Sequence, residues 1–297
     1  MNAVSLSHLG ISYGARRVLN DISFDIPSSQ VVGLLGRNGT GKTTLLRSLF
    51  GLIPTDAGTV SVLGRDPLRE APTMRLAVGF MSENCHLYRW MTGPQLGAFL
   101  APFYPAWNAQ ALAEDFRRLE IPADQPVGRM SKGTQRKLML ALTLAPAPEL
   151  LLLDEPLAGL DPVARDQIRD TIIGTLADRG TTILLSSQEV DEIAPICDRV
   201  LILGSSRLLL DASRDELAKR IRRIIVTLEN PVGAVPVHPN ILSATVLGSQ
   251  LELVLREFSE EALQALLANY KVRDVRTEGL SLREIFVACA GRKEVAI

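Results

Sequence analysis

Few folds can accommodate the glycine-rich segment that begins at residue 36 and reads GRNGTGKT. The segment fits the pattern G-x-x-x-x-G-K-[ST], in which glycines let backbone N–H groups close around a phosphate without interference from a Cβ. A short apolar run, residues 31–35, precedes it, and residues 42–49, which have helical spacing, follow it. A strand, a glycine loop and a helix in this order open an α/β nucleotide-binding fold.

The residue types of this loop suit the phosphates of a nucleotide. Lys42 supplies a mobile positive charge for the β- and γ-phosphates, and Thr43 supplies a hydroxyl for Mg²⁺. The helix that starts near Lys42 directs the positive end of its dipole at the same phosphates. We therefore expect the nucleotide to be bound at Gly36, Asn38, Gly39, Thr40, Gly41, Lys42, Thr43 and Thr44.

A second apolar run, residues 150–153, ends in two carboxylates, Asp154 and Glu155. Open α/β sheets place their ligands at the carboxyl ends of the strands. We expect Asp154 to hold Mg²⁺ through water and Glu155 to polarise the attacking water as a general base. A strand that ends in two acidic residues is more often a solvated strand end, but the nearby phosphate loop favours the hydrolytic role.

The pattern along the chain predicts an α/β protein with a P-loop NTPase core. Further apolar strands are expected at 183–185 and 200–203, and a helix is expected at 163–178, after the run at 150–153. This alternation of strands and helices predicts a mainly parallel sheet. We expect an N-terminal antiparallel β subdomain before the core and an inserted helical subdomain at about 84–145. Domain boundaries are expected at 1–220 and 221–297, the second being a small α+β extension with strands near 224–228, 251–255 and 272–276 and helices near 260–268 and 281–288.

Composition excludes several other classes of protein. With 32 basic and 33 acidic residues the net charge is −1, which argues against nucleic acid as a partner. The three cysteines, Cys85, Cys197 and Cys289, are far apart, which argues against a disulfide framework and a zinc site. We expect neither a signal peptide nor a membrane span, because the sequence shows no charged region followed by an apolar one at residues 1–10 and no apolar run of about 20 residues. We expect a cytoplasmic protein that reaches a membrane only through a partner.

With these motifs in place, residues 1–220 resemble the ATP-binding subunit of an ABC transporter. Ser131-Lys132-Gly133-Thr134 stands where that family has its L-S-G-G-Q signature, and Leu157-Ala158-Gly159-Leu160-Asp161 is similar to the loop that follows. The resemblance implies that ATP and Mg²⁺ are bound between two subunits, with Ser131 and Gly133 on the partner's γ-phosphate and Asp161 at the seam. It also implies that Tyr13 stacks on adenine.

The variant MSKGTQRK, the upstream FYPAW and the SLREIF ending resemble the bacterial exporter branch of the family. In that branch a separately encoded membrane permease forms the pathway. The resemblance therefore implies a peripheral protein on the inner face of the cell membrane that pairs with a second copy of itself or a related ATPase. It implies ATP hydrolysis that powers export, with the helical region after Glu83 as the surface on which the permease docks.

Two positions depart from the family pattern. Glu83 stands where the family has a glutamine, and its carboxylate can still ligand Mg²⁺. Gln188 stands where the family has a histidine, and a side-chain amide cannot exchange protons near neutral pH. We therefore expect intact ATP binding and slow hydrolysis, in a homodimer or beside a more competent partner ATPase.

Two other functions stay open at this stage. A regulatory nucleotide switch with little turnover is compatible with Glu83 and Gln188. An ATPase of DNA repair or translation is less favoured, because such chains usually carry two cassettes or a long coiled-coil insertion, and this sequence has one cassette and no basic patch.

Overall fold

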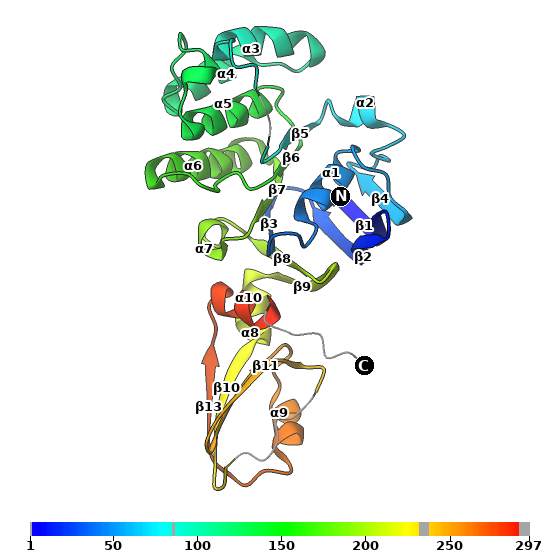
Figure 1. Cartoon of the computed structure of the whole chain (residues 1–297), viewed down its shortest axis with the longest axis vertical. Helices are drawn as coiled ribbons and strands as arrows, with labels where there is room; N and C mark the ends of the chain where they lie inside the picture. The colour runs from blue at the N-terminus through cyan, green and yellow to red at the C-terminus, as the bar shows by residue number, and fades with distance from the viewer. Residues whose placement is uncertain (1, 85–86, 232–237, 291–297) are drawn as a thin grey trace. The chain divides into compact units, whose positions relative to one another are not determined.

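A computed structural model describes residues 2–84, 87–231 and 238–290 of the chain (Figure 1). The chain divides into two compact units, residues 1–208 and residues 209–297, called unit 1 and unit 2 below. The domain boundary expected between residues 220 and 221 stays a prediction. Cys85 lies outside the described residues.

The main sheet has the strand order β5-β6-β7-β3-β8-β9, with β9 (Arg207–Ser213) next to β8. Its parallel strands are β3 (Val31–Gly36), β5 (Val78–Met81), β6 (Leu150–Leu153), β7 (Thr182–Ser187) and β8 (Arg199–Gly204). β3, β6 and β7 are buried along their whole length, as is typical of parallel strands that are covered on both faces. The mainly parallel sheet predicted from these apolar runs is confirmed.

An antiparallel sheet with the order β2-β1-β4 forms the N-terminal part of unit 1. Its strands are β1 (Asn2–Tyr13), β2 (Arg16–Pro27) and β4 (Ala57–Val62). Helix α1 (Lys42–Leu49) contacts β2 and β4 of this sheet and β3 of the parallel sheet. Buried residues of both sheets and of α1 belong to one apolar core, so the expected antiparallel β subdomain is confirmed and is packed onto the parallel sheet.

Helices form most of the region between β5 and β6, and Figure 1 shows them grouped together. They are α3 (Gly93–Leu100), α4 (Ala109–Arg118) and α5 (Lys132–Leu144), with short 3₁₀ turns η1 (Ala101–Phe103) and η2 (Val127–Arg129). The three α-helices and η2 share an apolar core of their own. Thr92 begins α3 with a capping box to Gln95, in which each residue satisfies a backbone N–H of the other.

The remaining helices of unit 1 are α2 (Ala71–Met74), α6 (Pro162–Arg179) and α7 (Val190–Ile193). The predicted helix at 163–178 corresponds to α6, which begins after Asp161 and ends at Gly180, where φ is 64°. A glycine in this left-handed conformation is a common helix stop. The chain passes from unit 1 to unit 2 within β9 (Arg207–Ser213).

Unit 2 is an antiparallel sheet with helices, as expected for the α+β extension. Its strands follow the order β11-β12-β10-β13. The elements are α8 (Arg214–Arg220), β10 (Arg222–Leu228), β11 (Ile241–Leu247), β12 (Gln250–Leu255), α9 (Glu260–Leu267), β13 (Val272–Gly279) and α10 (Leu282–Ala290). One face of the sheet forms an apolar core with α9.

Candidate functional site

The segments predicted to carry chemistry lie at one edge of the parallel sheet. β5, β6, β7 and β3 are neighbours in the sheet and run in the same direction. Their carboxyl ends are followed by Glu83, by Asp154 and Glu155, by Gln188 and by the glycine loop at 36–41. The topology therefore brings four separate parts of the sequence to the edge where open α/β sheets bind their ligands.

The glycine loop is held in a narrow space. A Cβ on Gly36 would lie 2.5 Å from Thr40 Oγ1 and 2.9 Å from the carbonyl oxygen of Leu203. Gly41 directly precedes α1 with a φ of 104°, and a Cβ there would lie 2.6 Å from Leu19 Cδ2. Both positions therefore require glycine for steric reasons.

The N-terminus of α1 presents its first backbone N–H groups at this loop. Gly41 offers no side chain to cap the helix, and the first turn of α1 contains no acidic residue. The first N–H groups of a helix have no partner within it and carry partial positive charge. Thr43 and Thr44, which are half-buried, lie in this turn. The arrangement is suited to an anion with several oxygens, such as a phosphate.

Lys42 and Glu155 form a buried ion pair beside the loop. Lys42 Nζ lies 3.2 Å from Glu155 Oε1, and the two side chains are only 6% and 7% exposed. Lys42 Nζ also donates to the carbonyl oxygen of Gly36 at 2.7 Å. The cation expected to meet phosphate is thus close to the carboxylate expected to act as a base, and an incoming phosphate would compete with Glu155 for it.

Burial raises the pKa of Glu155, and the nearby Lys42 ammonium only partly offsets that effect. The backbone of Glu155 has a positive φ of 49°, which is uncommon for a residue with a side chain. Its N–H donates to Ser186 Oγ at 2.9 Å, and its carbonyl oxygen accepts from Arg136 Nη1. Two distant segments therefore hold a residue whose carboxylate has raised proton affinity.

Asp154 is fully buried at the end of β6 and is only partly satisfied. Its Oδ1 accepts a hydrogen bond from Ser186 Oγ at 2.8 Å, whereas its Oδ2 has no hydrogen-bond partner among the described residues. An unpartnered buried carboxylate oxygen is costly. Oxygen ligands of this kind are those that Mg²⁺ prefers, so Asp154, with the Thr43 hydroxyl, fits a divalent cation.

Gln188 and Glu83 take different places at the edge. The backbone N–H of Gln188 donates to Glu155 Oε2 at 3.4 Å, while its side chain is exposed. Glu83 is exposed two residues beyond β5, whose Met81 carbonyl oxygen accepts from the N–H of Asp154 at 2.8 Å. Among the described residues, no hydrogen bond or ion pair engages the Glu83 carboxylate. The structure thus brings Gln188 to Glu155 but leaves Glu83 at the margin.

Ser131, Gly133 and Asp161 lie around the N-termini of two neighbouring helices. Ser131 Oγ caps α5 by accepting from Thr134 N–H at 3.1 Å, and Asp161 caps α6. A Cβ on Gly133 would lie 3.7 Å from Asp161 Oδ2. Ser131 is therefore the N-cap of α5, and this residue is exposed beside the first N–H groups of that helix. Roles of these three residues toward a second subunit stay predictions.

Tyr13 ends β1 in the hairpin with β2, and it is 52% exposed. A tyrosine in a strand is most often a core residue, but this one is not. Its ring is accessible for stacking, although adenine binding at Tyr13 stays a prediction.

Sequence reasoning missed two residues of this cluster, Ser186 and Arg136. Ser186 joins Asp154 to the backbone of Glu155 across two strands. The available sign was a pair of serines at the end of an otherwise apolar strand, TILLSS. Arg136 follows the Ser131 segment by one turn of α5, and the sequence alone does not indicate that it reaches Glu155.

Comparisons with known proteins support a single family. A model of the family described as "ABC transporter" matches residues 19–158. The chain is 29% identical over 290 residues to the ABC transporter ATP-binding protein YtrB of Bacillus subtilis, covering 98% of this chain and 99% of that protein. It is 32% identical over 272 residues to the Nod factor export ATP-binding protein I of Paraburkholderia xenovorans, covering 80% and 89%.

Solved structures agree on the fold. The structure of an ATP-binding subunit of an ABC transporter matches with a TM-score of 0.67 and 26% identity, over 72% of this chain and 91% of that one. In the part of the chain that the structure describes, no helix is both long and apolar enough to cross a membrane.

Proposed function

The chain belongs to the ABC transporter family as an ATP-binding subunit, and from this premise we propose that it hydrolyses ATP to power export through a separately encoded membrane permease. The observation that carries the proposal is the buried cluster of Lys42, Glu155, Asp154 and Ser186 beside the glycine loop. Export is supported by the similarity to a Nod factor export ATP-binding protein over 80% of the chain. The exported substrate is left undefined, because its contacts would lie in the permease.

In this proposal ATP enters with its phosphates on the loop and on the N-terminus of α1. Lys42 exchanges its ion pair with Glu155 for the β- and γ-phosphates, and Asp154 and Thr43 hold the cation. Mg²⁺, when bound, neutralises charge that develops on the phosphate oxygens. Glu155, released from Lys42, accepts a proton from the attacking water, and its raised pKa improves it as a base.

Turnover is proposed to be slow because of position 188. The backbone N–H of Gln188 positions the Glu155 carboxylate. The side-chain amide of Gln188 can donate or accept a hydrogen bond, but it cannot take up or release a proton near neutral pH as a histidine can. Gln188→Leu should lower turnover further and Gln188→His should raise it, with ATP affinity measured for each variant. An unchanged rate in both variants would show that residue 188 is not limiting.

A second ATP-binding subunit completes the site in this proposal. Ser131, Gly133 and Asp161 would approach the γ-phosphate that the partner's loop holds, because a hydroxyl and helix N–H groups form an anion cradle. A second copy of this chain or a related ATPase could fill that place. Ser131→Ala should lower turnover while leaving the affinity of a single subunit for ATP unchanged.

The permease is proposed to dock on the aromatic surface of the helical region, at the inner face of the cell membrane. Tyr88, Trp90, Phe99 and Phe103 are 46%, 74%, 46% and 62% exposed. The ring centroid of Tyr88 lies 5.0 Å from that of Trp90 and 5.8 Å from that of Phe99, and the centroids of Phe99 and Phe103 are 5.9 Å apart, so the four rings form one continuous patch. Exposed aromatic patches are characteristic of protein interfaces.

Docking can be tested by recovering the tagged chain from native membranes. The proposal expects a polytopic membrane protein in the complex, and it expects Trp90→Ala with Phe103→Ala to abolish that recovery without changing ATP turnover. Leu247→Ala, at a comparably exposed apolar residue of unit 2, serves as the matched control. Recovery that is equal in all variants would remove the aromatic patch from the proposal.

Gln188 also favours one alternative, a slow nucleotide switch that regulates a partner or needs a heterodimeric ATPase. Tight ATP binding with no turnover, with or without the permease, would support this alternative over the export motor.

A further inference from the structure

Strand β13 is an edge strand whose outer side has no partner strand among the described residues. It pairs with β10 on its inner side, from Arg222↔Gly279 to Thr227↔Asp274. All of its residues are exposed. An exposed edge with open backbone N–H and C=O groups is a template for pairing with another chain unless the protein blocks it.

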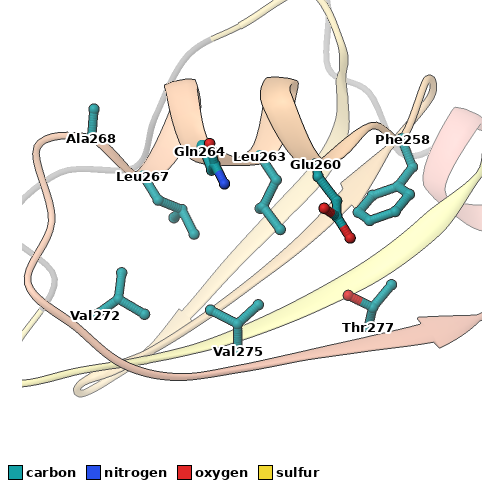
Figure 2. A pocket seen from close by; sticks show the side chains of 9 residues that line it. All are labelled: Phe258, Glu260, Leu263, Gln264, Leu267, Ala268, Val272, Val275 and Thr277. Atoms are coloured by element: carbon teal, nitrogen blue, oxygen red, sulfur yellow. The ribbon is translucent and has the colours of Figure 1, made fainter.

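An apolar groove runs beside this edge. Val272 and Val275 of β13 are 37% and 38% exposed. Together with residues of α9 they line a groove of about 430 Å³. Figure 2 shows Leu263 and Leu267 of α9 pointing toward the side chains of β13. Val275 lies opposite Val226, which in turn lies opposite Leu251. These three residues form an apolar row across the sheet, and the row ends at Val275 on the open edge.

Charged side chains can protect an edge strand by repelling any strand that approaches it. The charges of β13 do not have one common sign, so they do not simply repel a second copy of the strand. They alternate in sign along the strand, as Arg273, Asp274, Arg276 and Glu278. Directly opposite residues of paired strands lie on the same face of a sheet. When a two-fold axis relates two copies of β13, the strands pair antiparallel and one residue lies opposite its own copy. That residue is the centre of the register, and the short strand allows only a few centres.

These registers differ in charge. A centre at Asp274 or at Arg276 places like charges opposite each other. A centre at Val275 places Asp274 opposite the partner's Arg276 twice and brings the two valines together. A centre at Thr277 also pairs opposite charges, but it leaves fewer residues of the strand paired and both valines uncovered.

We propose that unit 2 pairs with unit 2 of a second copy of this chain through antiparallel β13 strands centred on Val275. The two sheets then form one sheet of eight strands, and the apolar row continues from one copy into the other. Because this contact involves neither the glycine loop nor the Ser131 segment, it holds two copies together whether or not ATP is bound.

Cysteine substitution in the full chain tests the register. Opposite Cα atoms in antiparallel strands are about 4.5–5.5 Å apart, within the range of about 4.4–6.8 Å that a disulfide spans. Val275→Cys should therefore give a covalent dimer under mild oxidation without nucleotide. Thr277→Cys is the matched control on the same face, because its two copies would be offset by four residues, or about 14 Å at about 3.4 Å per residue. The unsubstituted chain should give no such dimer.

Charge exchange tests the same contact without a covalent bond. Asp274→Arg and Arg276→Asp should each weaken nucleotide-free dimerisation about tenfold, since each makes two cross-strand pairs repulsive. The double variant should restore it to near the original value. Sedimentation of the unsubstituted chain should give twice its 32.3 kDa mass.

Several results would overturn the proposal: a monomer at tens of micromolar protein, cross-linking of Thr277→Cys in preference to Val275→Cys, or a double charge variant as weak as the single ones. Omitting nucleotide keeps these outcomes separate from the ATP-dependent contacts of unit 1.

Discussion

Ser186→Ala should destabilise the nucleotide-free protein far more than the loss of one surface hydroxyl. Ser186 Oγ donates to Asp154 Oδ1 at 2.8 Å and accepts from the N–H of Glu155 at 2.9 Å, and all three groups are buried. A hydrogen bond to a charged group contributes about 1.5–3 kcal/mol, and an unsatisfied buried N–H costs about 1–3 kcal/mol. Asp154 Oδ2 already has no partner among the described residues. We expect a loss of about 2–4 kcal/mol in the free energy of unfolding.

The assay is denaturant unfolding of the single and double variants with Asp154→Asn. The double-mutant cycle should give an interaction energy of about 1 kcal/mol or more between Ser186 and Asp154, as is found for residues in one hydrogen-bond network. Ser187→Ala is the control, because Ser187 Oγ bonds Glu189 and Glu192 rather than Asp154. A loss below about 0.5 kcal/mol for Ser186→Ala, or equal coupling of Ser187 to Asp154, would show that Ser186 does not hold Asp154 and Glu155 together.

Three further variants test other parts of the account. Gly36→Ala should cost about 1–3 kcal/mol of stability and weaken ATP binding in calorimetry, because its Cβ would lie 2.9 Å from the Leu203 carbonyl oxygen; normal ATP affinity would contradict it. Tyr13→Ala should weaken ATP binding roughly 2- to 10-fold with unchanged melting temperature, the effect of one lost aromatic stack; an equal loss for GTP and ATP would argue against adenine stacking. Hydrogen bonds from Ser281 lower the pKa of Glu284 to about 2, so ionised Glu284 stabilises the fold above about pH 4.3, its unfolded value, and this contribution is lost as pH falls toward 2. Glu284→Gln should make the melting temperature depend less on pH between about pH 2 and pH 4.3. An unchanged pH dependence would show that Glu284 does not make this contribution.

The core of unit 1 could be predicted because it depends on local patterns. Short apolar runs without alternation are typical of strands buried on both faces, and the glycine-loop pattern at 36–43 indicates a strand before it and a helix after it. β11 and β4 were missed, because most of their residues are half-buried or exposed and include Ser243, Thr245 and Thr59. Such strands are stabilised by pairing with neighbours rather than by their own composition.

The candidate site was predictable only in part, for a related reason. The residues at strand ends, Asp154, Glu155 and Gln188, follow from the topology of a parallel sheet. The hydrogen bonds that hold them do not, since Ser186 and Arg136 reach Glu155 from segments that are distant in sequence. The ion pair of Lys42 with Glu155 was also not expected, because each residue was assigned to phosphate or water rather than to the other.

Mg²⁺-dependent turnover of the unsubstituted chain and of Glu155→Gln measures whether ATP is hydrolysed where the glycine loop meets Glu155. The account predicts slow but measurable turnover that Glu155→Gln abolishes. It also predicts that this variant binds ATP at least as tightly, because Lys42 no longer shares its charge with a buried carboxylate 3.2 Å away. Turnover that survives Glu155→Gln, or ATP binding that is lost with it, would contradict the account.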